Sequence, residues 1–200
     1  VQVLARELVK QGHNVVVAGF YDWGYGGDSE FTDNGVKVYR FRRMLSSAAF
    51  QKQDSFFVRG MYKLLELSGI FQQDIKYSLK KYRDFLQGII TQHDIDIIEM
   101  PDYNDYIRFC NKKIQFPDLP APTIVKLHGS VTYFSMEAGE QVPDYVRDIE
   151  RDILLKADRV AGVSKYTAIQ TAKYLKYDKP VDVLYNGIDI PGIAGDIAKK

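Results

Sequence analysis

The sequence predicts an α/β fold, in the form of a Rossmann-like, doubly wound parallel sheet. Two apolar runs, NVVVAGF at 14–20 and TIVKL at 123–127, have few polar residues, which is typical of strands buried on both faces of a parallel sheet. Predicted helices alternate with predicted strands along the chain. Three strands in the second half end in small or polar residues, and such sheets bind ligands at the carboxyl ends of their strands.

The first half of the chain predicts helices and strands in alternation. Apolar residues at helical spacing predict helices, and continuous or alternating apolar runs predict strands. Gly12 and Ser68-Gly69 are the expected breaks. In chain order the predicted elements are a helix at 1–9, a strand at 14–20, a glycine-rich and aromatic loop at 21–34, a strand at 35–41, a mainly helical region at 43–92, a strand at 95–99 and a helix at 104–113.

The second half predicts three further strands separated by helices, after a proline-rich loop. The same periodicities identify these elements. In chain order they are a strand at 123–127 that ends at His128-Gly129, a helix at 142–156, a strand at 159–163 with Ser164 at its end, a helix at 166–174, and a strand at 181–184 that is followed by Asn186-Gly187.

Composition and charge exclude several classes of function. The chain has 27 basic and 26 acidic residues and a net charge of +1, so nothing favours nucleic acid or a strongly anionic membrane as a partner. No apolar run reaches membrane-spanning length. Cys110 is the single cysteine and is expected to be a small buried hydrophobic residue. Without an internal disulfide, a reducing, cytoplasmic location fits best.

One basic stretch raises the question of peripheral membrane contact. Acidic neighbours dilute its charge, so a solvated helix face is the preferred interpretation and contact with anionic lipid is the alternative. The basic residues are Arg59, Lys63, Lys76, Lys80, Lys81 and Arg83, and the acidic neighbours are Asp54, Glu66, Asp74 and Asp84.

Several motifs between Thr123 and Asp189 occur in a characteristic order. They are His128-Gly129 at a strand end, a helix that carries Glu150, Ala157-Asp158-Arg159-Val160 before a strand that ends in Val163-Ser164, and a last strand that ends in Tyr185-Asn186-Gly187-Ile188-Asp189. Together with Gly12-His13-Asn14-Val15 after the opening helix, this order resembles the N-terminal domain of the family 4 retaining glycosyltransferases, which have the GT-B fold.

The resemblance implies the N-terminal half of a GT-B fold, with 1–189 as the acceptor-side domain and 190–200 as the start of a linker or a tail. The family's first strand would precede Val1, and its C-terminal, donor-binding domain would follow Asp189. The implied reaction transfers a sugar with retention from a UDP- or GDP-sugar to a glycan or lipid-linked acceptor, as in polysaccharide biosynthesis, without a metal or other cofactor. The isolated chain is expected to be inactive.

The resemblance makes His128 the candidate catalytic residue, close to the transferred sugar. A histidine at the carboxyl end of a strand can hydrogen-bond a phosphate or sugar oxygen, and Gly129 allows a ligand to approach the backbone. Ser130 follows as a further candidate binding residue. Ser164 is interpreted chiefly as a helix N-cap, whose helix N-terminus can also face an anion.

Four further residues are candidates for substrate binding at the same edge. Asp102 and Tyr103 follow a strand, and the Asp102 carboxylate can bind an acceptor hydroxyl or form an Asx turn; both readings stay open. Asn186 and Gly187 are interpreted as chiefly structural, close to the cleft between domains. No general base is assigned.

Other patterns are judged less informative. The aromatic residues Tyr21, Trp23 and Tyr25 lie in a glycine-rich loop, which is either a sugar-stacking lip or, by default, a surface loop. Three patterns that imitate functional sites are rejected: Asp94-Ile95-Asp96 as a metal pair, Glu150 with Asp158 as an acidic pair, and the scattered His13, His93 and His128 as a metal site.

Two other functions remain as alternatives. A sugar-nucleotide epimerase of GT-B fold would share the same elements and would differ in its product. A non-catalytic α/β binding module would form an autonomous sheet with its own ligand.

Overall fold

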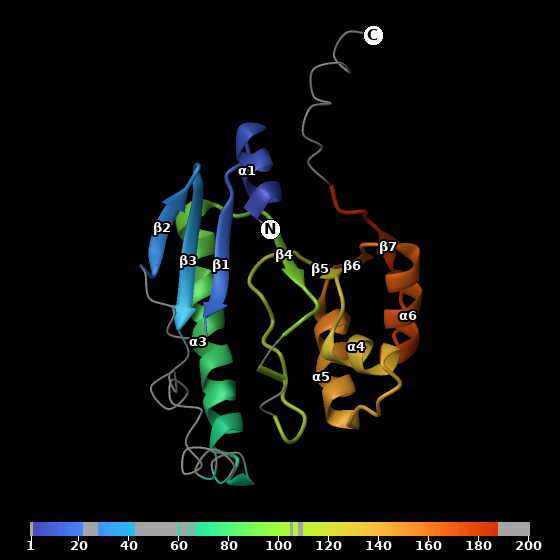
Figure 1. The fold of residues 1–200 in the computed structure, drawn as a ribbon. Coiled ribbons are helices and arrows are strands. Elements are labelled where there is room, and N and C mark those ends of the chain that lie inside the picture. Colours follow the sequence, from blue (N-terminus) through green and yellow to red (C-terminus); the bar gives the residue numbers. More distant parts are fainter. Residues whose placement is uncertain are drawn as a thin grey trace, which may run out of the picture.

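The computed structural model describes residues 2–21, 28–42, 60, 64, 67–104, 106, 107 and 110–187, which form two sheets with helices packed against them (Figure 1). The first sheet has the order β1-β3-β2 and the second the order β4-β5-β6-β7. The strands are β1 (Val16–Tyr21), β2 (Glu30–Asp33), β3 (Val36–Arg42), β4 (Ile98–Pro101), β5 (Thr123–Leu127), β6 (Arg159–Gly162) and β7 (Asp182–Val183). The helices are α1 (Gln2–Lys10), α3 (Ile70–His93), α4 (Val131–Glu137), α5 (Asp144–Lys156) and α6 (Lys165–Leu175).

The second sheet confirms the predicted Rossmann-like α/β class. All three of its strand pairs are parallel, and its strands are connected through helices or a long crossover segment. Val125 and Leu127 of β5 are fully buried in the main core cluster, together with Ile149 and Ile153 of α5. These two α5 residues are four apart and lie on one helix face, so α5 covers the Val125 side of the sheet.

The first sheet contains a strand that sequence analysis placed in a loop. β2 lies within the predicted 21–34 loop and pairs antiparallel with β3. Asn34 and Gly35 connect the two strands, with φ of 48° and 85°. Positive φ at both central residues is what a tight two-residue hairpin turn requires, and Asn-Gly is the sequence most typical of it. The loop prediction was therefore wrong for residues 30–33.

The long helix α3 begins where the sequence predicted a break. Gly69 precedes it with φ of 75°, a left-handed conformation that glycine adopts without strain. Ile75 and Leu79 are buried in the core cluster. Further along the helix, Tyr82 and Phe85 pack against Phe41 of β3, with ring centroids 5.3 and 5.4 Å apart. α3 therefore connects the two halves of the molecule.

Three further predictions need correction. The predicted helix at 104–113 is absent from the described residues there, of which only 106 and 107 form a turn of 3-10 helix. The Asn104 amide instead hydrogen-bonds the Asp102 carbonyl oxygen at 3.2 Å, and such local bonds compete with helix formation. β4 begins three residues later and ends two residues later than predicted, and it includes Pro101, which an edge strand tolerates. Helix α4 was not predicted.

Several predictions lie partly or wholly outside the described residues. The side chains of Tyr21, Trp23 and Tyr25 belong to this group. In the basic stretch, the described side chains of α3 lie mainly on its exposed face: Lys76, Lys80, Lys81 and Arg83. Among the described helices, none combines the length and the apolar character needed to cross a membrane.

Candidate functional site

The carboxyl ends of β4 to β7 form one edge of the second sheet, because all four strands are parallel. Asp102 directly follows β4, His128 follows β5, and Ser164 and Asn186 lie two and three residues beyond β6 and β7. Strand order places His128 between the ends of β4 and β6. This edge is where doubly wound sheets bind their ligands.

Asp102 braces the turn that carries His128. Its Oδ1 atom accepts hydrogen bonds from the backbone N–H groups of His128 at 2.9 Å and Gly129 at 3.2 Å. The residue is only 3% exposed. Burial raises the pKa of Asp102, and the backbone hydrogen bonds oppose that rise. In this structure the Asp102 carboxylate therefore binds backbone N–H groups and stabilises the turn that follows β5.

Glu150 of α5 likewise accepts hydrogen bonds, in its case from the N-terminus of α4. Its Oε1 accepts from the Val131 N–H at 2.8 Å, and its Oε2 accepts from the Thr132 N–H and the Ser130 hydroxyl, both at 3.0 Å. A negative charge at a helix N-terminus satisfies free N–H groups and the helix dipole. Burial raises the pKa of Glu150, while these hydrogen bonds lower it.

Ser130 and Gly129 are therefore occupied by contacts within the protein. The Ser130 hydroxyl donates to Glu150 and accepts from the Tyr133 N–H at 3.2 Å, so it is the N-cap of α4. Gly129 has φ of 130°, and a Cβ atom there would lie 2.6 Å from the Phe134 ring. The left-handed backbone requires glycine at this position, and an added Cβ would also displace the exposed Phe134 ring.

Ser164 confirms the N-cap prediction. Its hydroxyl oxygen accepts from the Thr167 N–H at 3.0 Å and hydrogen-bonds the Thr167 hydroxyl at 2.9 Å. The hydroxyl thus provides a hydrogen-bond acceptor for a free N–H group at the N-terminus of α6. Like Ser130, it uses its hydrogen-bonding capacity inside the fold.

His128 differs from these neighbours, because its side chain is exposed. In the described part of the chain its ring nitrogens have no hydrogen-bond partner. Partial burial, followed by the positive charge of Lys126, lowers the pKa of His128. A neutral imidazole has one donor and one acceptor nitrogen, so His128 is the candidate side chain at this edge that is available to a ligand.

The remaining predicted residues lie at or near the same edge without a defined contact to His128. Tyr103 is half-buried, and Asn186 and Gly187 are exposed beyond β7. A Cβ atom added at Gly187 would meet nothing within 4 Å. Asn186 and His128 follow strands that are separated by β6.

The residues of the two rejected acidic pairs do not meet at the carboxyl edge of the sheet. Asp94 ends α3 in a left-handed conformation, before β4 begins. The Asp158 carboxylate accepts from the Thr123 N–H at 2.8 Å, at the amino end of β5, whereas Glu150 binds groups beyond its carboxyl end. Across the described residues, no group of three or more histidine, cysteine, aspartate or glutamate side chains is placed to hold a metal ion.

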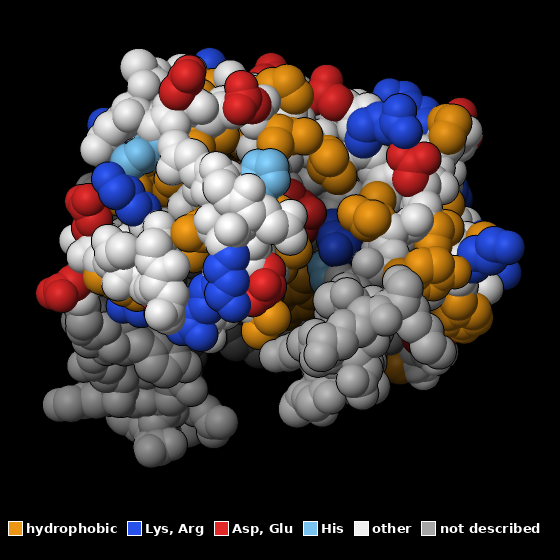
Figure 2. All heavy atoms as spheres, turned by 90° about the horizontal axis from the view of Figure 1, so that it is seen from above, with side chains coloured by type: hydrophobic (Ala, Val, Ile, Leu, Met, Phe, Trp, Pro, Cys, Tyr) orange, Lys and Arg blue, Asp and Glu red, His pale blue; other side chains and the backbone are white. Residues whose placement is uncertain are grey.

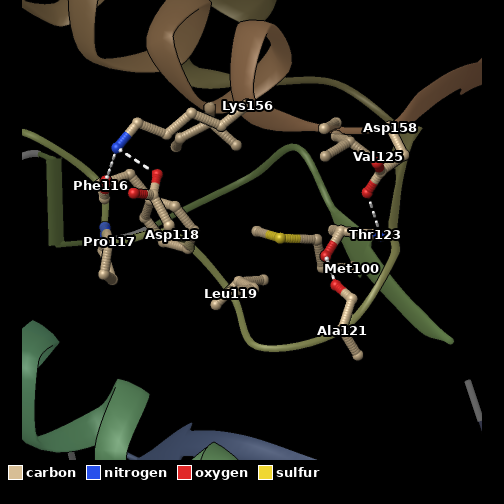
Figure 3. Close-up of a pocket in the computed structure, with 12 residues that line it drawn as sticks. Met100, Phe116, Pro117, Asp118, Leu119, Ala121, Thr123, Val125, Lys156 and Asp158 are labelled. Carbon is tan, nitrogen blue, oxygen red and sulfur yellow. Dashed lines mark hydrogen bonds and ion pairs between the residues drawn. The ribbon is translucent and has the colours of Figure 1, made fainter. Parts of the chain in front are cut away.

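One cavity lies at the opposite edge of the sheet from His128. This cavity has a volume of about 270 Å³. Figure 3 shows residues that line it, among them Met100, Thr123 and Asp158. Lys156 hydrogen-bonds the Phe116 carbonyl oxygen and forms an ion pair with Asp118 at 3.0 Å. Because its charged groups are already paired and it lies near the amino ends of the strands, this cavity is not the candidate site.

Lys126 is a residue that sequence analysis missed. It lies in β5 and is 5% exposed. Its signal in the sequence is a single lysine inside the apolar run TIVKL. Seen from above, the molecule is hollowed between its two halves, and basic and histidine side chains lie deep in the hollow (Figure 2).

Comparison with known proteins gives one match. The family model described as Glycosyltransferase Family 4 matches residues 1–190 of the chain. No curated protein and no solved structure shows a significant match.

Proposed function

Because the chain belongs to Glycosyltransferase Family 4, we propose that it is the acceptor-side domain of a retaining enzyme that transfers a sugar from a UDP- or GDP-sugar to a glycan or lipid-linked acceptor. The observation that carries the proposal is the exposed His128 side chain at the carboxyl edge of the sheet, on a turn that Asp102 holds by two backbone hydrogen bonds. Family membership supports glycosyl transfer in general, and the proposal adds the donor, the acceptor and the stereochemistry.

In the proposed mechanism, His128 binds the donor by a hydrogen bond. A neutral imidazole N–H donates to an oxygen of the transferred sugar or of the donor phosphate. When the glycosidic bond to the nucleotide breaks, negative charge develops on the phosphate oxygens. The imidazole N–H, a hydrogen-bond donor already in position, stabilises that charge. The lowered pKa of His128 favours the neutral ring that this role uses. The proposal requires no metal.

We propose that a further parallel strand joins the two sheets. β1 and β4 are edge strands of their sheets, and Figure 1 shows them as the strands nearest to the opposite sheet. Edge strands have unpaired N–H and C=O groups along one side. A strand encoded before Val1 would pair with both edges. Extending the chain at that end should raise its urea midpoint, and an unchanged midpoint would contradict this proposal.

The other parts of the proposal concern the whole protein. A C-terminal domain after residues 190–200 binds most of the donor, and the cleft between the two domains is the place of transfer. A cytoplasmic location, with peripheral membrane contact, accommodates a lipid-linked acceptor. The buried, reduced thiol of Cys110 is compatible with a reducing compartment.

Product analysis of the protein expressed from its full coding sequence tests the function. We expect a new glycosidic bond with the anomeric configuration of the donor, and an epimerised sugar nucleotide would instead support the epimerase. His128→Gln should lower kcat by about 100-fold, as loss of a positioned transition-state donor does. His13→Gln, at an exposed position before β1, is the matched control. The chain of residues 1–200 alone should show no turnover.

A further inference from the structure

Lys126 occupies a position that a parallel β-strand normally fills with an apolar residue. Its neighbours Val125 and Leu127 point into the main core cluster. Because side chains alternate between the two faces of a strand, Lys126 points to the opposite face. His128, two residues further on, begins on that same face. The two residues are therefore neighbours along one side of β5 at its carboxyl end.

Among the residues that the structure describes, the Lys126 ammonium group has no partner. The residue is 5% exposed, and in the described part of the chain its Nζ atom forms neither a hydrogen bond nor an ion pair. Glu99, on the same face of β4 by register, forms no ion pair with it. Without a counter-charge, the ammonium group adds no ion pair to the stability of the folded chain. The lysine is therefore not explained by the stability of the folded chain.

The Nζ atom nevertheless remains accessible. It is not among the described polar atoms that are both fully enclosed and without a partner. A lysine that buries its aliphatic stem and keeps its ammonium group in contact with solvent holds that group in a defined position. Binding of an anion there would supply the missing counter-charge, and a lysine is a common phosphate-binding residue.

The backbone donors at the end of β5 and the start of α4 are not available for that anion. The N–H groups of His128 and Gly129 bind Asp102, and the N-terminus of α4 binds Glu150. Two carboxylates thus already occupy the positions that a phosphate would otherwise take. At the end of β5, among the described residues, Lys126 and the His128 ring are the groups left for a ligand.

We propose that Lys126 binds a phosphate group of a substrate next to His128. This inference rests on the proposed glycosyl transfer and names two sources for the phosphate, the diphosphate of the sugar-nucleotide donor and the phosphate of a phosphorylated acceptor. In either case Lys126 is a binding residue, and it takes no part in breaking the glycosidic bond.

Calorimetric titration of residues 1–200 with inorganic pyrophosphate tests the site directly. We expect saturable binding that weakens about tenfold or more in Lys126→Met, because the charge that binds the anion is lost. Lys126→Arg should retain most of the binding. Lys113→Met, at an exposed position, should leave it unchanged. Absence of saturable binding, or equal binding by Lys126→Met, would overturn the proposal.

Stability measurements separate lost binding from misfolding. Replacing Lys126 by an apolar side chain of similar length should not lower the urea midpoint, because no ion pair is lost and a buried aliphatic stem is retained. Lys126→Gln serves as a second uncharged variant if Lys126→Met unfolds. A folded uncharged variant with unchanged pyrophosphate affinity would contradict the role of Lys126.

Kinetics of the protein from its full coding sequence identify the source of the phosphate. In Lys126→Met, a raised KM for the sugar nucleotide alone assigns the donor diphosphate, and a raised KM for the acceptor alone assigns the acceptor phosphate. Unchanged KM values for both would overturn the proposal. If the wild-type protein transferred no sugar, the proposed function would fail, while the pyrophosphate titration would still decide whether the anion site exists.

Discussion

Two carboxylates and two basic side chains lie at the carboxyl edge of the sheet. They differ in how they hydrogen-bond within the protein. Asp102 and Glu150 are 3% and 2% exposed, and each accepts hydrogen bonds from at least two backbone N–H groups. The side chains of Lys126 and His128 have no hydrogen-bond partner in the described part of the chain. The carboxylates thus stabilise the two turns, whereas the basic groups contribute no comparable contact.

This difference distinguishes residues that stabilise the fold from residues that are available to a ligand at the same edge of the sheet. Local rules of folding are satisfied where a residue supports the fold, and violations without compensation are expected at functional sites. Substitution of the carboxylates should therefore lower stability, and substitution of Lys126 should affect ligand binding. The predictions below test that separation.

The largest effect is expected for Glu150→Gln. An amide can accept through only one oxygen, and its NH₂ group would face donors that need an acceptor. Loss of charged hydrogen bonds at a buried site predicts a fall in the free energy of unfolding of about 3 kcal/mol. Urea unfolding followed by circular dichroism measures it. Glu140→Gln, at an exposed position, should change stability little, and equal effects of the two substitutions would refute the bracing role of Glu150.

Gly129→Ala should have the next largest effect. The alanine Cβ would meet the Phe134 ring at 2.6 Å, and φ of 130° is unfavourable for any residue with a side chain. Backbone strain together with displacement of the ring predicts a loss of about 2 kcal/mol. Gly187→Ala is the control, since a Cβ there meets nothing within 4 Å. A similar urea midpoint for both variants would show that the Gly129 turn is not constrained.

Sequence analysis located elements whose signals are local. The strand at 123–127 has the predicted bounds, and the Ser164 cap was predicted because its bond to Thr167 spans three residues. It missed α4, which has seven residues and several β-branched and aromatic side chains of modest helix propensity. Its N-terminus is stabilised by Glu150, some 20 residues away along the chain, a contact that helical periodicity does not reveal.

The candidate site shows the same limit. The sequence placed Asp102, His128 and Gly129 at strand ends, but not the hydrogen bonds between them, because their partners are 26 and 27 residues apart. The hairpin at β2 is different, since its Asn34-Gly35 turn is a local signal that was overlooked. The burial of Lys126 could not be predicted from its own neighbourhood in the sequence, because it depends on how β4, β5 and β6 pair.

Ser164→Ala is expected to have a smaller effect than the substitutions at Glu150 and Gly129. It removes one N-cap hydrogen bond from α6, which predicts a loss of about 1 kcal/mol. Ser164→Asp retains an acceptor for the Thr167 N–H and should restore most of the stability. Thermal unfolding compares the three proteins. If Ser164→Asp were as unstable as Ser164→Ala, the hydroxyl would have another role at this edge.

The smallest effect concerns the ionisation of His128 in Lys126→Met. Burial and the charge of Lys126 lower the pKa of His128 from its ordinary value of 6.5, so removal of the charge should raise it. The unfolded chain binds this proton more tightly than the folded chain, so the stability linked to neutral His128 is present above pH 6.5 and is lost as pH falls toward the lowered pKa. That pH dependence should weaken in Lys126→Met. NMR titration of the histidine Cε1–H signals measures the pKa, with His13 and His93 as internal references. An unchanged or lower pKa of His128 would mean that Lys126 does not share its surroundings, and the two basic groups would then not form one site.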